Sequence, residues 1–309
     1  MTRPQSAHRP PMRNGVSASA VSLVPGPWVL LIDFLCDRFP RVSRADWHSR
    51  LLRGDVLDAA GLQLGSGAAY QTHSLVYYFR EPAPELPIPF EEKVLYRDAH
   101  LLIADKPHFL PVMPSGRYLQ ETLLVRLKRK LDLENLVPVH RIDRDTAGLV
   151  MFSLNPQSRG AYVALFRNRQ VQKNYEAIAA WRDEIALPMT LRNRIESSDA
   201  FMCMQVTEGE ANSETYIELL ERHGEWARYG LSPLTGRRHQ LRVQMAKLGM
   251  PILHDNIYPT LSPEWPVGVA PDFSQPLQLL ARTLAFDDPM TGKARRFESA
   301  LRLSMPTAA

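Results

Sequence analysis

The densest group of chemically capable side chains in this sequence lies between positions 138 and 148. Two carboxylates and two guanidinium groups occur there, on Asp143, Asp145, Arg141 and Arg144. A carboxylate beside arginines stays ionised because the opposite charge favours its charged form, and a nucleophile or general base needs an ionised carboxylate. An exposed turn with ordinary ion pairs is the competing interpretation.

A second group of basic residues lies between positions 234 and 243. Arg238 and Arg242 are four residues apart, so a helix that starts near Arg238 would carry both on one face. Gly236 would then leave backbone amides free for a phosphate at the helix start. A basic helix end that serves only solubility is the alternative.

A third group lies between positions 171 and 178, where the residues alternate as in a β-strand. This alternation places Lys173 and Tyr175 on the same face. Taken alone, a tyrosine in such a strand is more often a core or edge residue than a catalytic one.

The elements around these groups predict the fold class. Strands are predicted at 94–96, 101–104 and 149–152, and helices at 121–131 and 158–166. Their irregular order favours an α+β fold with a mixed or largely antiparallel sheet over a doubly wound parallel one. The sequence has neither common glycine-rich phosphate loop, which argues against nucleotide hydrolysis and dinucleotide chemistry.

The N-terminal part reads as a separate small module over residues 28–80. Its pattern predicts a helix over 29–35, a second helix capped by Ser43, and strands at 56–57 and 75–79. This order predicts a small α/β module.

Three further boundaries complete the domain organisation. Residues 1–27 are basic and lack acidic side chains, and we predict a disordered tail there rather than a targeting peptide. Residues 81–90 include four prolines within nine positions, which predicts a stiff linker. A large catalytic domain is predicted over 91–305.

Composition sets broad limits on the function. Among the 309 residues, 45% are hydrophobic and 23% charged, as in ordinary globular proteins, and the net charge of +4 mildly favours a polyanionic partner. Cys36 and Cys203 lie far apart without zinc-like spacing, which fits a reduced, cytoplasmic setting. The longest apolar stretch is far shorter than the roughly 20 residues that cross a bilayer, so we predict no membrane span.

The three groups, in this order, resemble the RluA family of pseudouridine synthases over about residues 92–302. The strongest match is His-Arg-Ile-Asp at 140–143, followed by Thr146 and Gly148. The resemblance implies the pseudouridine synthase fold, with helices flanking the central sheet. It also implies an enzyme that isomerises specific uridines in ribosomal or transfer RNA, with ribosomal RNA favoured by the appended N-terminal module. We expect no cofactor or metal, because the reaction involves neither redox chemistry nor group transfer, and a monomer is the default expectation.

The resemblance assigns three catalytic positions. Asp143 is the catalytic carboxylate, Arg242 pairs with it, and Tyr175 stacks on the base and could help to remove the final proton. The sequence departs from the family pattern at Ala147 and at two positions nearer the C-terminus, His254 and Leu280. These departures bear on substrate and local geometry more than on activity.

A weaker resemblance links the N-terminal module to a small RNA-binding module of a small-subunit ribosomal protein. It rests on residues 39–45 and 52–56, and a purely structural appendage is the alternative. The candidate RNA contacts of the whole chain are Arg141, Arg237, Arg238, His239, Lys173, Arg44 and Arg53. Among them, Arg141 is predicted to fill the space that a flipped base leaves, or else to clamp a phosphate.

Two other functions are compatible with the sequence. Hard metal ligands for a nuclease are available on Asp143, Asp145, His239, His254 and Asp255, and a chelator would separate this function from an isomerase. A catalytically inactive RNA-binding or ribosome-assembly factor is the second alternative. Loss of product on Asp143→Asn with RNA binding retained would separate enzyme from binder.

Overall fold

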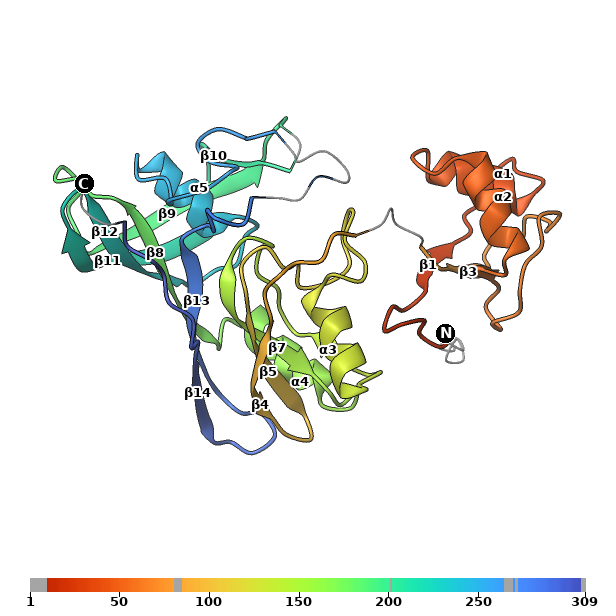
Figure 1. The fold of residues 1–309 in the computed structure, drawn as a ribbon, viewed down its shortest axis with the longest axis horizontal. Helices are drawn as coiled ribbons and strands as arrows, with labels where there is room; N and C mark the ends of the chain where they lie inside the picture. Colours follow the sequence, from red (N-terminus) through yellow and green to blue (C-terminus); the bar gives the residue numbers. More distant parts are fainter. Residues whose placement is uncertain (1–9, 81–84, 201, 264–268, 270–271, 307–309) are drawn as a thin grey trace. The chain divides into compact units, whose positions relative to one another are not determined.

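The computed structural model describes residues 10–80, 85–200, 202–263, 269 and 272–306. The chain divides into two compact units, Met1–Ala83 and Pro84–Ala309 (Figure 1). This division falls inside the segment predicted as a linker. Among the residues described, none of the helices has the length and apolar character that a membrane crossing needs.

The N-terminal unit packs two helices on a three-stranded antiparallel sheet. Its elements are β1 Ser19–Ser22, α1 Leu31–Arg38, α2 Arg44–Leu52, β2 Val56–Leu57 and β3 Leu75–Tyr78, with strand order β1-β3-β2. The predicted cap at Ser43 is present. The Ser43 hydroxyl accepts a hydrogen bond from the Asp46 backbone amide, and the Asp46 carboxylate accepts one from the Ser43 backbone amide. Trp47 and Leu35 are fully buried and anchor the core between helices and sheet.

The prediction of a disordered tail over 1–27 is wrong for β1. Ser19 lies opposite Tyr78, and β1 pairs with β3 along its whole length. Val21 and Leu23 are buried in the module core. Burial of these side chains stabilises β1, although its two serines make the local sequence unlike a typical strand. Residues 1–9 lie outside the described part.

The end of the predicted linker packs on the large unit. The carboxylate of Glu85 accepts hydrogen bonds from the backbone amides of Gln120 and Glu121. Ile88 is buried in the same core as α3. The segment 81–90 is therefore not a spacer throughout, because its second half belongs to the large unit; residues 81–84 lie outside the described part.

The large unit is built on one sheet in which the described residues form eleven strands. Its elements are β4 Lys93–Arg97, β5 Leu101–Lys106, α3 Leu123–Leu131, β6 Val137–Pro138, β7 Ala147–Ser153, α4 Arg159–Arg167, β8 Gln172–Ala180, β9 Met189–Ser197, β10 Met204–Thr207, β11 Ser213–His223, β12 Trp226–Pro233, α5 Gln240–Lys247, β13 Leu279–Asp287 and β14 Ala294–Glu298. The strand order is β10-β9-β11-β12-β8-β13-β7-β5-β4, with β14 on β13 and β6 on β7. In the described sheet only β13 and β7 run parallel, so the predicted α+β class with a largely antiparallel sheet is confirmed.

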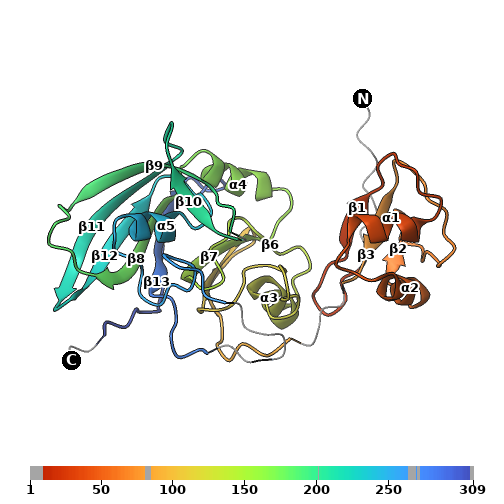
Figure 2. The same cartoon turned by 90° about the horizontal axis from the view of Figure 1, so that it is seen from above.

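Helices cover both faces of the sheet (Figure 2). Leu127 of α3 packs with Leu102 on one face of β5, and Tyr162 of α4 packs with Ile103 on the other. Helix α5 covers the other half of the sheet, where Met245 packs against β8, β11 and β12. The chain segments before β7 and before α5 meet where the two halves of the sheet join, and both carry the groups singled out in the sequence.

Gly148 lets β7 and β13 approach closely. Its φ is +110°, and a Cβ there would lie 2.3 Å from the carbonyl oxygen of Ala281.

We expect Gly148→Ala to lower the free energy of unfolding by about 2 to 4 kcal/mol, because backbone strain and overpacking add. Urea denaturation measures this change. Gly160→Ala in α4 is the matched control, because a Cβ at Gly160 meets open space. This change should stabilise the helix by about 0.5 to 1 kcal/mol. Equal changes in the free energy of unfolding at both sites would contradict the steric explanation.

Candidate active site

The loop that carries Asp143 is held from one side by His140. The ring of His140 stacks on Phe166 with centroids 4.5 Å apart, and its Nε2 accepts a hydrogen bond from the Met151 amide at 3.0 Å. Burial, with a smaller contribution from the charge of Lys173, lowers the pKa of His140 to about 3. The imidazole therefore stays neutral and remains available as an acceptor that ties the loop to β7.

The same loop is held from the other side by Lys106 and His108. The Lys106 ammonium donates to the carbonyl oxygen of Arg144 at 2.8 Å, and Nδ1 of His108 donates to the carbonyl oxygen of Asp145 at 2.8 Å. Both contacts fix the backbone immediately after Asp143. Such fixed surroundings hold a reactive group in place before substrate arrives.

Lys106 also makes the stability of this region pH-dependent. Its side chain is fully buried, which lowers its pKa to about 7 although Asp145 and Asp143 oppose the shift. The unfolded chain, with an ordinary lysine pKa, binds more protons than the folded chain above pH 7, so folding becomes more favourable as pH rises.

We therefore expect the stability of the wild type, relative to Lys106→Met, to increase by about 2 kcal/mol between pH 7 and pH 9. Urea denaturation at a series of pH values measures it. Lys93→Met, at an exposed position on β4, controls for loss of a lysine. If the difference in free energy of unfolding between the wild type and Lys106→Met stayed constant from pH 7 to pH 9, the lowered pKa of Lys106 would be refuted.

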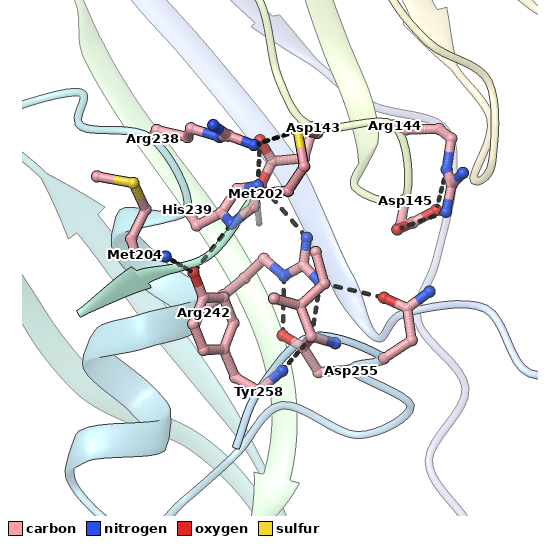
Figure 3. Close-up of polar contacts among 12 residues, drawn as sticks. Asp143, Arg144, Asp145, Met202, Met204, Arg238, His239, Arg242, Asp255 and Tyr258 are labelled. Atoms are coloured by element: carbon pink, nitrogen blue, oxygen red, sulfur yellow. Dashed lines mark hydrogen bonds and ion pairs between the residues drawn. The ribbon is translucent and has the colours of Figure 1, made fainter. Parts of the chain in front are cut away.

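Asp143 itself projects towards the start of α5 (Figure 3). Its carboxylate lies 3.6 Å from Nη1 of Arg242 and 3.9 Å from Nε2 of His239. The Asp143 side chain is 29% exposed, whereas that of Arg242 is 1% exposed. The carboxylate is thus reachable from solvent while its cationic partner is not.

Arg242 is held in place by a second carboxylate, Asp255. Nε and Nη2 of Arg242 donate to the two Asp255 oxygens at 2.8 and 2.6 Å, and Nη2 also lies 3.4 Å from the Asn256 amide oxygen (Figure 3). Burial alone would lower the pKa of Arg242, but the bonds to Asp255 and the charge of Asp143 outweigh it and raise that pKa. Arg242 is therefore a permanent positive charge beside Asp143.

His239 lies between Asp143 and Tyr258. Its Nδ1 is 3.0 Å from the Tyr258 hydroxyl, and its backbone adopts a left-handed conformation that caps α5. Burial is the main cause that lowers the pKa of His239, assisted by the charge of Arg242 and opposed by Asp143. A neutral His239 leaves Arg242 as the charged partner of Asp143.

Tyr175 completes the group from β8. It lies opposite Leu231 of β12 and Ala281 of β13, and its ring packs partly on the core under α5. Burial, and then the charge of Asp143, raise the pKa of Tyr175 well above its usual range. The fold thus brings together Asp143, Tyr175 and Arg242, with Tyr175 as a protonated phenol.

Known proteins similar to this chain identify its family. A family model described as RNA pseudouridylate synthase matches residues 100–247. The dual-specificity RNA pseudouridine synthase RluA of Haemophilus influenzae is 31% identical over 216 residues, which are 67% of this chain and 91% of that protein. The ribosomal large subunit pseudouridine synthase D of Pseudomonas aeruginosa is 31% identical over 227 residues, which are 68% of each chain. The chain belongs to the RluA family of RNA pseudouridine synthases.

A solved structure agrees on the fold of this synthase. Human RNA pseudouridylate synthase domain containing 1 superimposes with a TM-score of 0.55 at 21% identity, covering 70% of this chain and 86% of that one. The solved structure therefore shows the pseudouridine synthase fold, and membership of the family makes the protein an isomerase.

The basic residues predicted to contact RNA fall into two sets in the synthase. Arg141, Arg237 and Arg238 are exposed on the loops around Asp143. Arg238 precedes α5, which starts at Gln240, so the prediction that Arg238 and Arg242 share a helical face is wrong. The reason is that His239, the N-cap residue, is left-handed, so the helix begins only at Gln240. Ahead of the helix, the Arg237 amide donates to the side-chain oxygen of Gln240 at 3.0 Å. The same bond occupies an amide that was expected to be free for phosphate.

The other predicted RNA contacts already have protein partners. Lys173 donates to the carbonyl oxygen of Thr235 at 2.8 Å, and burial lowers its pKa to about 8. In the N-terminal unit, Arg44 pairs with Asp33 at 2.7 Å and Arg53 pairs with Asp55 at 3.0 Å. His239, predicted to hold a backbone phosphate, is buried beside Asp143, and its Nδ1 lies 3.0 Å from the Tyr258 hydroxyl.

Sequence reasoning missed the residues that hold the site. These are Lys106, His108 and Asp255, of which the sequence marks only Asp255 as a candidate, and then as a metal ligand. In the described part of the chain, no three His, Cys, Asp or Glu side chains are grouped to hold a metal ion. The conspicuous signal was the run His254-Asp255 after a Gly-Met-Pro turn, but its partner Arg242 lies on another element.

Proposed function

We propose that this synthase isomerises specific uridines in structured RNA, ribosomal RNA in the first place, with Asp143 as the catalytic carboxylate. The observation that carries the proposal is a reachable carboxylate held beside a buried, permanently charged arginine and a protonated tyrosine, Arg242 and Tyr175. Ribosomal RNA is favoured because of the similar ribosomal large subunit synthase and the appended N-terminal module; transfer RNA is the alternative substrate. A cytoplasmic monomer is part of the same proposal.

The reaction needs only rearranged bonds within one nucleotide. The bond from the uracil nitrogen to the ribose carbon breaks, the base rotates, and its carbon 5 joins the same ribose carbon. The proton on carbon 5 then leaves, and the nitrogen that carried the ribose takes up a proton from solvent. No electrons or groups are exchanged with another molecule, so the atoms balance without a co-reactant. Asp143 either attacks the nucleotide or removes a ribose proton, and in both cases Arg242 places a positive charge 3.6 Å from the carboxylate.

Tyr175 is assigned to binding rather than to proton removal. Its raised pKa makes the phenolate rare at neutral pH, and a neutral phenol is a weak proton acceptor. A ring on the strand beside Asp143 can instead stack on the uracil. The target base must leave its own stack to reach this position, and exposed Arg141 lies next to Asp143, where it can fill the vacated space.

Tritium release from RNA labelled at carbon 5 of uracil tests the proposal. The wild type is expected to release tritium from bulk ribosomal RNA, more slowly or not at all from transfer RNA, and equally with and without a chelator. Loss of release with the chelator would favour metal chemistry. No release from either RNA by folded protein that binds RNA would refute the proposed substrates and favour an inactive RNA-binding factor.

A further inference from the structure

An open pocket of about 480 Å³ lies beside the loop between β12 and α5. The charged residues that line it are four arginines and two glutamates, Arg169, Arg192, Arg194, Arg237, Glu210 and Glu214. Pockets for small organic ligands are lined mainly by apolar side chains, and this one is not. An excess of guanidinium groups suits an anion with several oxygens, because each guanidinium can donate two parallel hydrogen bonds to it.

Two of the arginines have guanidinium N–H groups that are not used in hydrogen bonds within the described part of the chain. The side chain of Arg169 is exposed in the turn before β8 and makes no hydrogen bond within the part of the chain that the structure describes, although its backbone amide donates to the carbonyl oxygen of Phe166. The side chain of Arg237 uses only its Nε, which donates to the carbonyl oxygen of Asn212 at 3.0 Å. Its terminal nitrogens are left for a ligand.

The other two arginines are held by weak, replaceable ion pairs. Arg192 and Arg194 lie two residues apart on β9 and so share one face. Arg192 pairs with Glu214 at 3.0 Å and is 67% exposed, and Arg194 pairs with Glu196 at 2.6 Å and is 41% exposed. Pairs this exposed contribute about 0 to 1 kcal/mol. A phosphate can therefore replace these carboxylates as partner at little cost in stability.

The pocket adjoins the active site through two chain segments. Lys173, two residues before Tyr175, donates to the carbonyl oxygen of Thr235 in the pocket wall. Arg237 precedes His239 by two residues, which spans at most about 7 Å. An RNA strand that presents a uridine to the site therefore has the pocket within its immediate reach.

We propose that this pocket binds a backbone phosphate of the RNA strand flanking the target uridine. The proposal rests on the proposed function and deepens it, since it assigns Arg169, Arg192 and Arg194 to RNA binding. It also predicts that the RNA strand runs from the active site towards this pocket. A phosphate held there would position the nucleotide before the base turns towards Asp143.

Binding of a single-stranded RNA probe tests the proposal on the full chain. The probe is a fluorescent oligouridylate of about 20 nucleotides, longer than the roughly 4 to 16 that single-strand sites cover. We expect Arg192→Gln/Arg194→Gln to weaken its binding about tenfold and to reduce the slope of log affinity against log salt by about 1. The KM for ribosomal RNA should rise in parallel.

The matched control is Arg182→Gln/Arg222→Gln. Arg222 is exposed near the end of β11, at the end opposite to the pocket, Arg182 is exposed in the loop after β8, and the charge change is identical. The control should leave affinity, salt slope and tritium release unchanged. Equal affinities and slopes for the wild type and both double variants would overturn the proposal, as expected if the pocket instead took free phosphate or an acidic protein segment. Absence of tritium release with the affinity difference intact would refute the proposed substrate and leave the pocket assignment standing.

Discussion

Asp143→Asn should lower the rate of tritium release by at least about 10³-fold. The amide keeps the size of the side chain but can neither attack the nucleotide nor accept a proton. Stability should change little, because the side chain is partly exposed and Arg242 keeps its two bonds to Asp255. Single-turnover release from ribosomal RNA and a urea denaturation curve measure the two quantities.

Measuring RNA affinity distinguishes a loss of catalysis in Asp143→Asn from a loss of RNA binding. Removing a negative charge from an RNA-binding surface should leave the affinity for oligouridylate unchanged or slightly tighter, because repulsion of the phosphates decreases. Asp183→Asn, at an exposed carboxylate paired with Arg222, is the matched control for loss of one charge. Tritium release by Asp143→Asn near the wild-type rate would remove Asp143 from the mechanism.

Elements with strong local signals could be predicted from the sequence. Helix α2 was located because Ser43 and Asp46 form a capping box, which needs only neighbouring residues. Strands β5 and β7 were located because fully buried strands read as short apolar runs. Strand β1 was missed because its partner β3 begins at Leu75, and burial of Val21 on that partner is not visible in the local pattern.

The active site shows the same division between local and distant information. The composition of the loop around Asp143 marked it as unusual, but only the family resemblance joined it to Tyr175 and Arg242. The residues that hold Asp143 in place act across the fold: Lys106 lies at the end of β5 and bonds to the carbonyl of Arg144. A buried lysine with backbone partners has no signature in sequence spacing.

Asp255→Asn is expected to destabilise the protein by about 3 to 5 kcal/mol, because it leaves the buried charge of Arg242 without its closest partner. Both side chains of this pair are 1% exposed. The asparagine oxygen can still accept the amides of Ile257 and Tyr258, as Asp255 does at 2.8 and 3.0 Å, so the turn itself is preserved. Urea denaturation measures the loss. Asp183→Asn, 79% exposed, should cost at most about 1 kcal/mol.

A double variant separates the cost of the unpaired charge from the function of the arginine. In Arg242→Met/Asp255→Asn no buried charge is left unpaired, so much of the stability lost in Asp255→Asn should return. Tritium release should not return, because Asp143 then lacks the cation that faces its carboxylate at 3.6 Å. Recovery of both stability and activity would show that Arg242 serves only the fold. Recovery of stability alone assigns Asp255 to positioning and Arg242 to the chemistry of Asp143.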